Sequence, residues 1–164
     1  MTPTEIAWWL RRLPGLADAA DAPLKELAQH WEPLVVAGRT FLVEGQPSDG
    51  LYMLVEGQVE VVRGGPDGNP VMVGMVEPPD LLGFAGVLTR HNAIASTRAR
   101  GRIVLLRLPE ERARELLLRD DAVSAVLRRA LLVALARRLA KANRMFARLS
   151  SQAQATATET PLLV

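Results

Sequence analysis

Between Leu34 and Leu108 the sequence alternates short apolar runs with turn-forming residues, and turns recur every 6–12 residues. Apolar runs of this length, bounded by Gly, Pro, Asn and Asp, are typical of β-strands. About eight such runs are present, and the segment from Gly64 to Pro70 is the densest turn signal between them. Because many short strands with close turns favour antiparallel closure, this region is predicted to form an antiparallel sandwich or jelly roll.

Helical patterns flank this β region on both sides. Residues 1–33 contain two apolar stripes at helical spacing, ended by Pro14 and Pro33. Residues 109–149 begin with Pro109 and two glutamates, which suit the first turn of a helix, and continue into a long predicted helix over 122–149. Residues 150–164 have low complexity and no periodicity, so they are predicted to be disordered. With 164 residues the chain suits one α+β, mainly β, domain.

Several functional classes are disfavoured by what the sequence lacks. It has no cysteine, and its two histidines, His30 and His91, do not stand at metal-ligand spacing, so no metal site is expected. No nucleophile–base pair or paired carboxylates suggest an enzyme. The N-terminus lacks a signal-peptide pattern and no apolar run reaches the length of a membrane span, so a cytoplasmic protein without membrane contact is expected.

The last predicted helix carries two further features. Seven basic and no acidic residues lie between Arg128 and Arg148, a pattern that is typical of a solvated face or of a surface for phosphates, acidic lipids or an acidic protein. Apolar residues also recur at alternating steps of three and four, which is a heptad-type seam. The seam predicts a parallel homodimer, with packing onto the chain's own sheet as the alternative. Its residues are Leu132, Leu135, Leu139, Ala142, Phe146 and Leu149.

The segment 78–99, PPDLLGFAGVLTRHNAIASTRA, has the layout of an anion cradle. Gly83 stands where a short apolar run meets a helical turn, and a glycine there leaves backbone N–H groups free to face an anion. A polar loop follows, and the chain returns as an extended segment at Ala93.

The segment 38–61 resembles the cyclic nucleotide-binding domain family. The family pattern is a glycine, then E-G-x-x-x-D, then L-Y-x-L/I-x-x-G-x-V-x-V. The residues that fit it are Gly38, Glu44, Gly45, Asp49, Leu51, Tyr52, Gly57, Val59 and Val61. The resemblance extends over residues 13–149 and implies an eight-stranded β-roll followed by a dimerisation helix, as in the sensor half of the catabolite activator protein class. In that class a DNA-binding domain follows the helix, and no such segment follows Leu149 in this sequence.

Segment 78–99 falls where the family has its phosphate-binding cassette. The family pattern there is F-G-E-L-A-L-L, then a loop, then P-R-x-A-T-V. The resemblance implies ribose binding by the glutamate and phosphate binding by the arginine, but these positions hold Phe84 and Ala93. Affinity for cAMP or cGMP is therefore expected to be weak, since each charge-assisted bond contributes about 1.5–3 kcal/mol. The remaining cassette positions that match or neighbour the pattern are Gly83, Ala85, Ala95 and Ser96.

Other side chains are candidates to complete the pocket. Arg90, His91 or Arg98 are possible substitutes for the missing cation, with solvated loop charges as the alternative. The resemblance also places Arg138 and Asn143 of the last helix near the base of a bound nucleotide.

Three functions remain open at this point. The first is a dimeric regulatory domain that senses a small molecule, and the second is an interaction module that keeps the fold without a ligand and binds an effector protein. The third, nucleic-acid binding by the basic helix, has no recognition motif to support it.

Overall fold

The computed structural model describes residues 1–89 and 92–158 of the chain. Within these residues the helices are α1 (Pro3–Arg11), α2 (Asp21–Ala28), α3 (Phe84–Thr89), α4 (Glu110–Leu118) and α5 (Ala122–Thr158). The strands are β1 (Glu32–Ala37), β2 (Thr40–Leu42), β3 (Gly50–Gly64), β4 (Pro70–Val76), β5 (Asp80–Leu82) and β6 (Ser96–Pro109). None of the described helices is long and apolar enough to cross a membrane.

The strands form one antiparallel sheet that is rolled around its own interior. Its main path is β1-β6-β3-β4, with β2 attached to β6 and β5 attached to β3. The long strands β3 and β6 pair along most of their length, from Gly50 opposite Pro109 to Val62 opposite Ser96. The predicted fold class, mainly antiparallel β with flanking helices, is confirmed.

The structure has six strands in its described part where the sequence pattern indicated about eight. Residues 51–55 and 59–62 belong to one strand, as do residues 96–99 and 103–108. The pairing of β3 with β6 shifts its register on both sides of Glu56, close to Gly57, whose φ is +88°. Gly101 in β6 has a φ of +76°. Positive-φ glycines in these strands allow local irregularity without a reversal of the chain, so each long strand reads in the sequence as two short ones.

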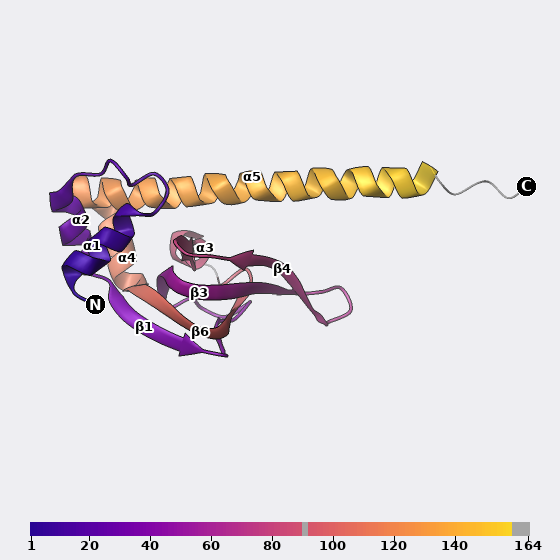
Figure 1. Cartoon of the computed structure of the whole chain (residues 1–164), viewed down its shortest axis with the longest axis horizontal. Coiled ribbons are helices and arrows are strands. Elements are labelled where there is room, and N and C mark those ends of the chain that lie inside the picture. Colours follow the sequence, from indigo (N-terminus) through magenta and orange to yellow (C-terminus); the bar gives the residue numbers. More distant parts are fainter. Residues whose placement is uncertain (90–91, 159–164) are drawn as a thin grey trace, which may run out of the picture.

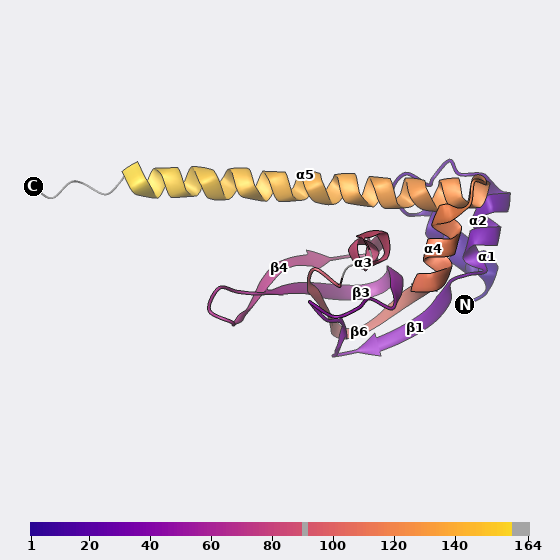
Figure 2. The same ribbon diagram turned by 180° about the vertical axis from the view of Figure 1, so that it is seen from behind.

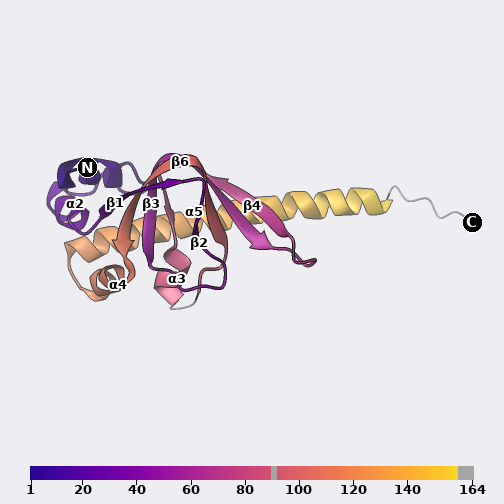
Figure 3. The same cartoon turned by 90° about the horizontal axis from the view of Figure 1, so that it is seen from below.

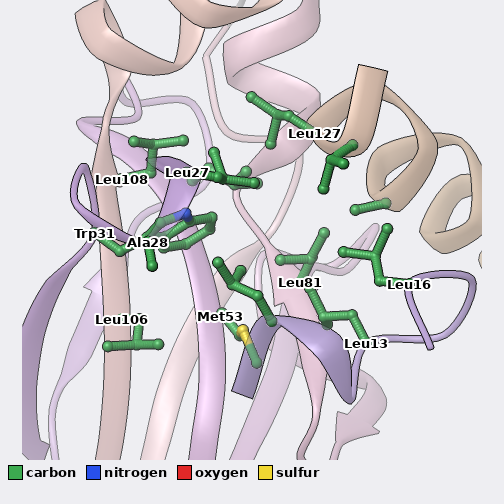
Figure 4. Packing of buried hydrophobic residues seen from close by; sticks show 14 of the residues in the cluster. Leu13, Leu16, Leu27, Ala28, Trp31, Met53, Leu81, Leu106, Leu108 and Leu127 are labelled. Atoms are coloured by element: carbon green, nitrogen blue, oxygen red, sulfur yellow. The ribbon is translucent and has the colours of Figure 1, made fainter. Parts of the chain in front are cut away.

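The core consists of two clusters on opposite sides of the sheet. One joins the sheet to α1, α2, α4 and the first turns of α5, and Trp31, Met53 and Leu127 belong to it. Figure 4 shows these side chains packed between helices and strands. The other fills the roll interior and includes Tyr52, Leu82 and Ile103. Both clusters draw on β3 and β6, so the helices and the roll share one folding unit.

The helices α1, α2, α4 and the start of α5 gather at one end of the roll (Figures 1 and 3). α1 begins with a reciprocal cap, because Glu5 N–H donates to Thr2 Oγ1 and Thr2 N–H donates to a Glu5 carboxylate oxygen. At the start of α5, Ser124 N–H donates to Asp121 Oδ1 at 2.8 Å, which caps the first turn of the helix.

α5 runs beside the roll and continues beyond it (Figures 1 and 2). The structure differs from the predicted disorder after residue 149, because the helix continues to Thr158. Residues 150–158 contain neither glycine nor proline and are rich in Ala and Gln, which are good helix formers. Residues 159–164 lie outside the described part of the chain.

Candidate functional site

The backbone of the cradle is held by a glycine that no other residue can replace without strain. β5 pairs with β3 through Leu82 and Tyr52, and Gly83 then turns the chain into α3 with a φ of +78°. A Cβ at this position would lie 2.6 Å from the carbonyl oxygen of Gly50. The predicted strand-to-helix turn at Gly83 is therefore present, and it depends on both the conformation and the close packing of this residue.

Phe84 turns inward at the first position of α3. Its side chain is 7% exposed and belongs to the cluster between the sheet and the helices. The guanidinium carbon of Arg138, from α5, lies 4.9 Å from the centre of the Phe84 ring. The position at which the family pattern has a carboxylate is thus occupied by a buried ring beneath a cation.

The returning segment of the cradle is tied to the loop between β2 and β3. Ala93 N–H donates to Gln46 O at 2.8 Å, and Gly45 N–H donates to Ala93 O at 2.9 Å. The hydroxyl of Ser96 accepts a hydrogen bond from Glu44 N–H at 2.9 Å. Ser96 therefore holds the backbone of the site and is absent from the residues that line its cavity.

A small cavity of about 110 Å³ lies inside the cradle. Its walls are largely apolar, and among the described residues the polar side chains that line it belong to Thr97 and Arg138. Ligand pockets are usually roughly 300–1,000 Å³, so this cavity is small for a nucleotide. Its lining residues are Leu42, Val61, Leu82, Gly83, Phe84, Ala85, Ala93, Ile94, Ala95, Thr97 and Arg138.

Arg138 connects α5 to the cradle. Its Nη2 donates to the carbonyl oxygen of Leu81 at 2.5 Å and lies 3.4 Å from Asp80 Oδ2. A second cavity, of about 190 Å³, lies between β4 and α5 and is also lined by Val61 and Arg138. The Arg138 side chain therefore borders both cavities.

The other candidates lie in different places. Asn143 is on an exposed turn of α5 and lines neither of these two cavities, although Ala142 beside it lines the second. Arg98 forms an ion pair with Glu60 at 3.2 Å and does not line the cradle cavity. Arg90 and His91 fall outside the described residues. Thr97 lines the cradle cavity but was not predicted as a site residue. The sequence held a signal for it, because Thr97 and Ala95 are two positions apart in an extended segment and so lie on the same face.

The residues of the predicted seam are all exposed in the single chain, although Ala142 also lines the cavity between β4 and α5, so the alternative of packing on the chain's own sheet stays open. Phe146, for example, is 74% exposed. Their role in a dimer stays a prediction. Among the described residues there is no group of three or more side chains that could hold a metal ion.

Comparison with known proteins places this geometry in context. The family profile described as "Cyclic nucleotide-binding domain" matches residues 34–120. A CRP-like cAMP-activated global transcriptional regulator of Mycobacterium tuberculosis is 37% identical over 46 residues, which are 28% of this chain and 20% of the regulator.

Solved structures extend the likeness to most of the chain. The N-terminal domain of a transcriptional regulator from Streptomyces coelicolor is 33% identical, with a TM-score of 0.62 over 84% of this chain and 94% of that one. A cyclic nucleotide-binding domain from Methylobacillus flagellatus has a TM-score of 0.75 at 17% identity, covering 99% and 86% of the two chains. Thermus thermophilus catabolite activator protein has a TM-score of 0.69 at 22% identity, over 91% and 63%. At these last two identities the likeness concerns the fold.

Proposed function

The chain belongs to the cyclic nucleotide-binding domain family, and from this premise we propose that it is a regulatory sensor domain. In this proposal a small molecule in the cradle changes how α5 sits on the roll, and α5 transmits the change to a second copy or an effector protein. The observation that carries the proposal is the hydrogen bond from Arg138 to the backbone carbonyl oxygen of Leu81, which does not involve the side chain of Phe84. One side chain thereby joins the only described helix that extends beyond the roll to the candidate ligand site.

The coupling follows from the position of Arg138 at the cavity wall. A molecule that enters the cavity contacts Arg138, and its binding energy differs between conformations in which Arg138 does and does not engage the cradle. A ligand shifts such an equilibrium by its difference in affinity for the two states. Beyond Ala134 the described side chains of the helix contribute nothing to the two core clusters, so its outer part can move without disrupting them.

We propose that cAMP and cGMP themselves bind weakly. Phe84 and Ala93 stand at the positions of the two charged anchors, and the cavity of about 110 Å³ is smaller than a nucleotide requires. The double substitution Phe84→Glu with Ala93→Arg should raise cAMP affinity about 10²–10⁴-fold, since it restores two charge-assisted contacts. Isothermal titration calorimetry measures this gain, and Phe84→Gln with Ala93→Gln is the uncharged control. Tight cAMP binding by the unmodified chain would contradict the proposal of weak binding.

We also propose that α5 pairs with α5 of a second copy through the seam. Residues 139–149 are all exposed in the single chain, and apolar side chains recur along this part of the helix. The basic residues Arg137, Lys141 and Arg144 alternate with the seam along the helix, so a parallel pair leaves them accessible to an acidic effector.

The coupling itself is tested by hydrogen–deuterium exchange of α5 in the cAMP-binding double variant, with and without cAMP. We expect ligand to change exchange in residues 132–149, and Arg138→Met to abolish that change while cAMP still binds. Unaltered exchange in α5 at saturating cAMP would contradict a sensor role. It would favour the second candidate, an interaction module without a ligand, which the burial of Phe84 in the cradle also supports.

A further inference from the structure

Two residues that line the cradle cavity each carry a buried polar atom without a hydrogen-bond partner among the described residues, Thr97 Oγ1 and Arg138 Nε. Thr97 is 5% exposed, so its hydroxyl is shielded from bulk solvent. Both residues line the same cavity. Buried polar groups are nearly always hydrogen-bonded in folded proteins, and exceptions call for a ligand, an ion or an ordered water.

The rest of the cavity restricts what can satisfy these atoms. Leu42, Val61 and Leu82 contribute apolar wall, and no carboxylate lines the cavity among the described residues. A volume of about 110 Å³ is smaller than the roughly 150 Å³ apolar cavity that accepts benzene, so a ligand here has few non-hydrogen atoms. Ordered water would satisfy the polar atoms but would leave the apolar wall hydrated.

The charge of the site favours an anion with a single charged group. Arg138 is a permanent cation, and its carboxylate neighbour Asp80 is held through Nη2 at 3.4 Å, which leaves Nε unpartnered. Nε–H is a charged donor, and the hydroxyl of Thr97 is a second donor. Two donors at an otherwise apolar cavity suit a carboxylate with a short hydrocarbon chain better than a phosphate, which presents more charge and more acceptors.

From these observations we propose that the cradle binds a short-chain monocarboxylate of about two to four carbons, an inference that rests on the proposed sensor function. The carboxylate would accept from Arg138 Nε and the Thr97 hydroxyl, and its hydrocarbon chain would lie against the leucine and valine wall. Because the anion would share the Arg138 guanidinium with Asp80, which contacts Nη2, its binding would alter the contact between α5 and β5.

The test is calorimetry of the full chain, in a carboxylate-free buffer at constant ionic strength, with acetate, propionate, butyrate, hexanoate and butyramide. Affinity should rise about fourfold for each methylene up to butyrate, because each buried methylene adds a constant increment. It should stop rising at hexanoate, whose chain exceeds the cavity, and should fall at least tenfold at butyramide, which lacks the charge. Equal affinity for acids of all chain lengths, or no binding at 20 mM acid, would overturn the proposal. Ordered water would then be the partner of the two polar atoms.

Variants locate the site. Thr97→Val has nearly the same shape without the hydroxyl and should weaken butyrate binding at least fivefold, while Arg138→Met should abolish it. Arg137→Met is the matched control, since this neighbouring arginine does not line the cradle cavity, and it should leave binding unchanged. Equal binding by the Arg138 and Arg137 variants would place butyrate elsewhere and contradict the proposal.

The monocarboxylate proposal and the sensor proposal can fail independently of each other. If the cAMP-binding double variant changes exchange in α5 on adding cAMP but the unmodified chain binds none of the acids, the ligand class is wrong and the sensor proposal stands. If the acids bind as expected but α5 responds to neither ligand, the sensor proposal fails.

Discussion

At the scale of single residues, Gly83 decides whether the cradle forms. Its positive φ costs any other residue about 1–3 kcal/mol, and an added Cβ would lie 2.6 Å from Gly50 O. We therefore expect Gly83→Ala to lower the free energy of unfolding by at least this amount in urea denaturation. Gly38→Ala is an informative control, because its φ is also positive but no atom lies within 4 Å of the added Cβ. Equal losses in both variants would show that the contact with Gly50 is unimportant.

Among the described residues, His30 is the one from which we expect pH dependence between pH 7 and 5. Partial burial lowers its pKa below the ordinary value of 6.5, and the nearby guanidinium groups of Arg112 and Arg119 lower it further. The unfolded chain thus binds the proton more tightly than the folded chain. The stability contributed by the neutral ring is complete above pH 6.5 and is lost as the pH falls toward the folded-state pKa.

The expected outcome is that His30→Gln reduces the loss of unfolding free energy between pH 7 and 5, measured by urea denaturation at each pH. Carboxylates with lowered pKa values, such as Glu44 beside Gly64 N–H and Arg63, contribute in a more acidic range, below their ordinary 4.5. An unchanged pH dependence in the variant would contradict the role assigned to His30.

At the scale of elements, α5 has two parts with different roles. Its first turns are buried against α2 and α4, whereas its outer part presents the seam. Leu139 is 64% exposed in the single chain, so Leu139→Glu should leave the fold intact and weaken self-association about 10²–10⁴-fold, since a pair loses two buried leucines. Sedimentation equilibrium measures this loss. Leu118→Glu is the matched control at an 81% exposed leucine outside the seam, and equal weakening there would argue against the seam.

At the scale of the whole molecule, stability and signalling are expected to reside in separate regions. The two core clusters extend from Ile6 to Ala134, and residues 139–149 are exposed. Deleting residues 143–164 should therefore change the unfolding free energy of the monomer by less than about 0.5 kcal/mol, as for other surface changes. Leu131→Ala, in the core, should cost about 2–5 kcal/mol. Urea denaturation at low protein concentration measures the unfolding free energy of both variants. A large loss of unfolding free energy in the deletion variant would show that the outer helix stabilises the roll.

Much of this architecture could be predicted from the chain alone, because strand alternation, turn residues and helix caps are local signals. The cradle at Gly83, the exposed seam and the substitution of both charged anchors were all visible in the sequence. Two long strands were each predicted as two short ones, because a glycine with positive φ inside a strand cannot be told from a turn glycine by the sequence alone. The helix beyond residue 149 was missed because low complexity is a weaker signal than the propensity of Ala and Gln for helix.

The sequence by itself determined the family, the fold class and the absence of the two charged anchors, because these depend on residue types at short spacing. Only the tertiary structure decided that Phe84 lies under Arg138, that Thr97 and Arg138 share one cavity, and how small that cavity is. These contacts join α5 to β5, α3 and β6, which are distant in the sequence. Their geometry is set by how the long helix packs on the roll, and no local pattern specifies it.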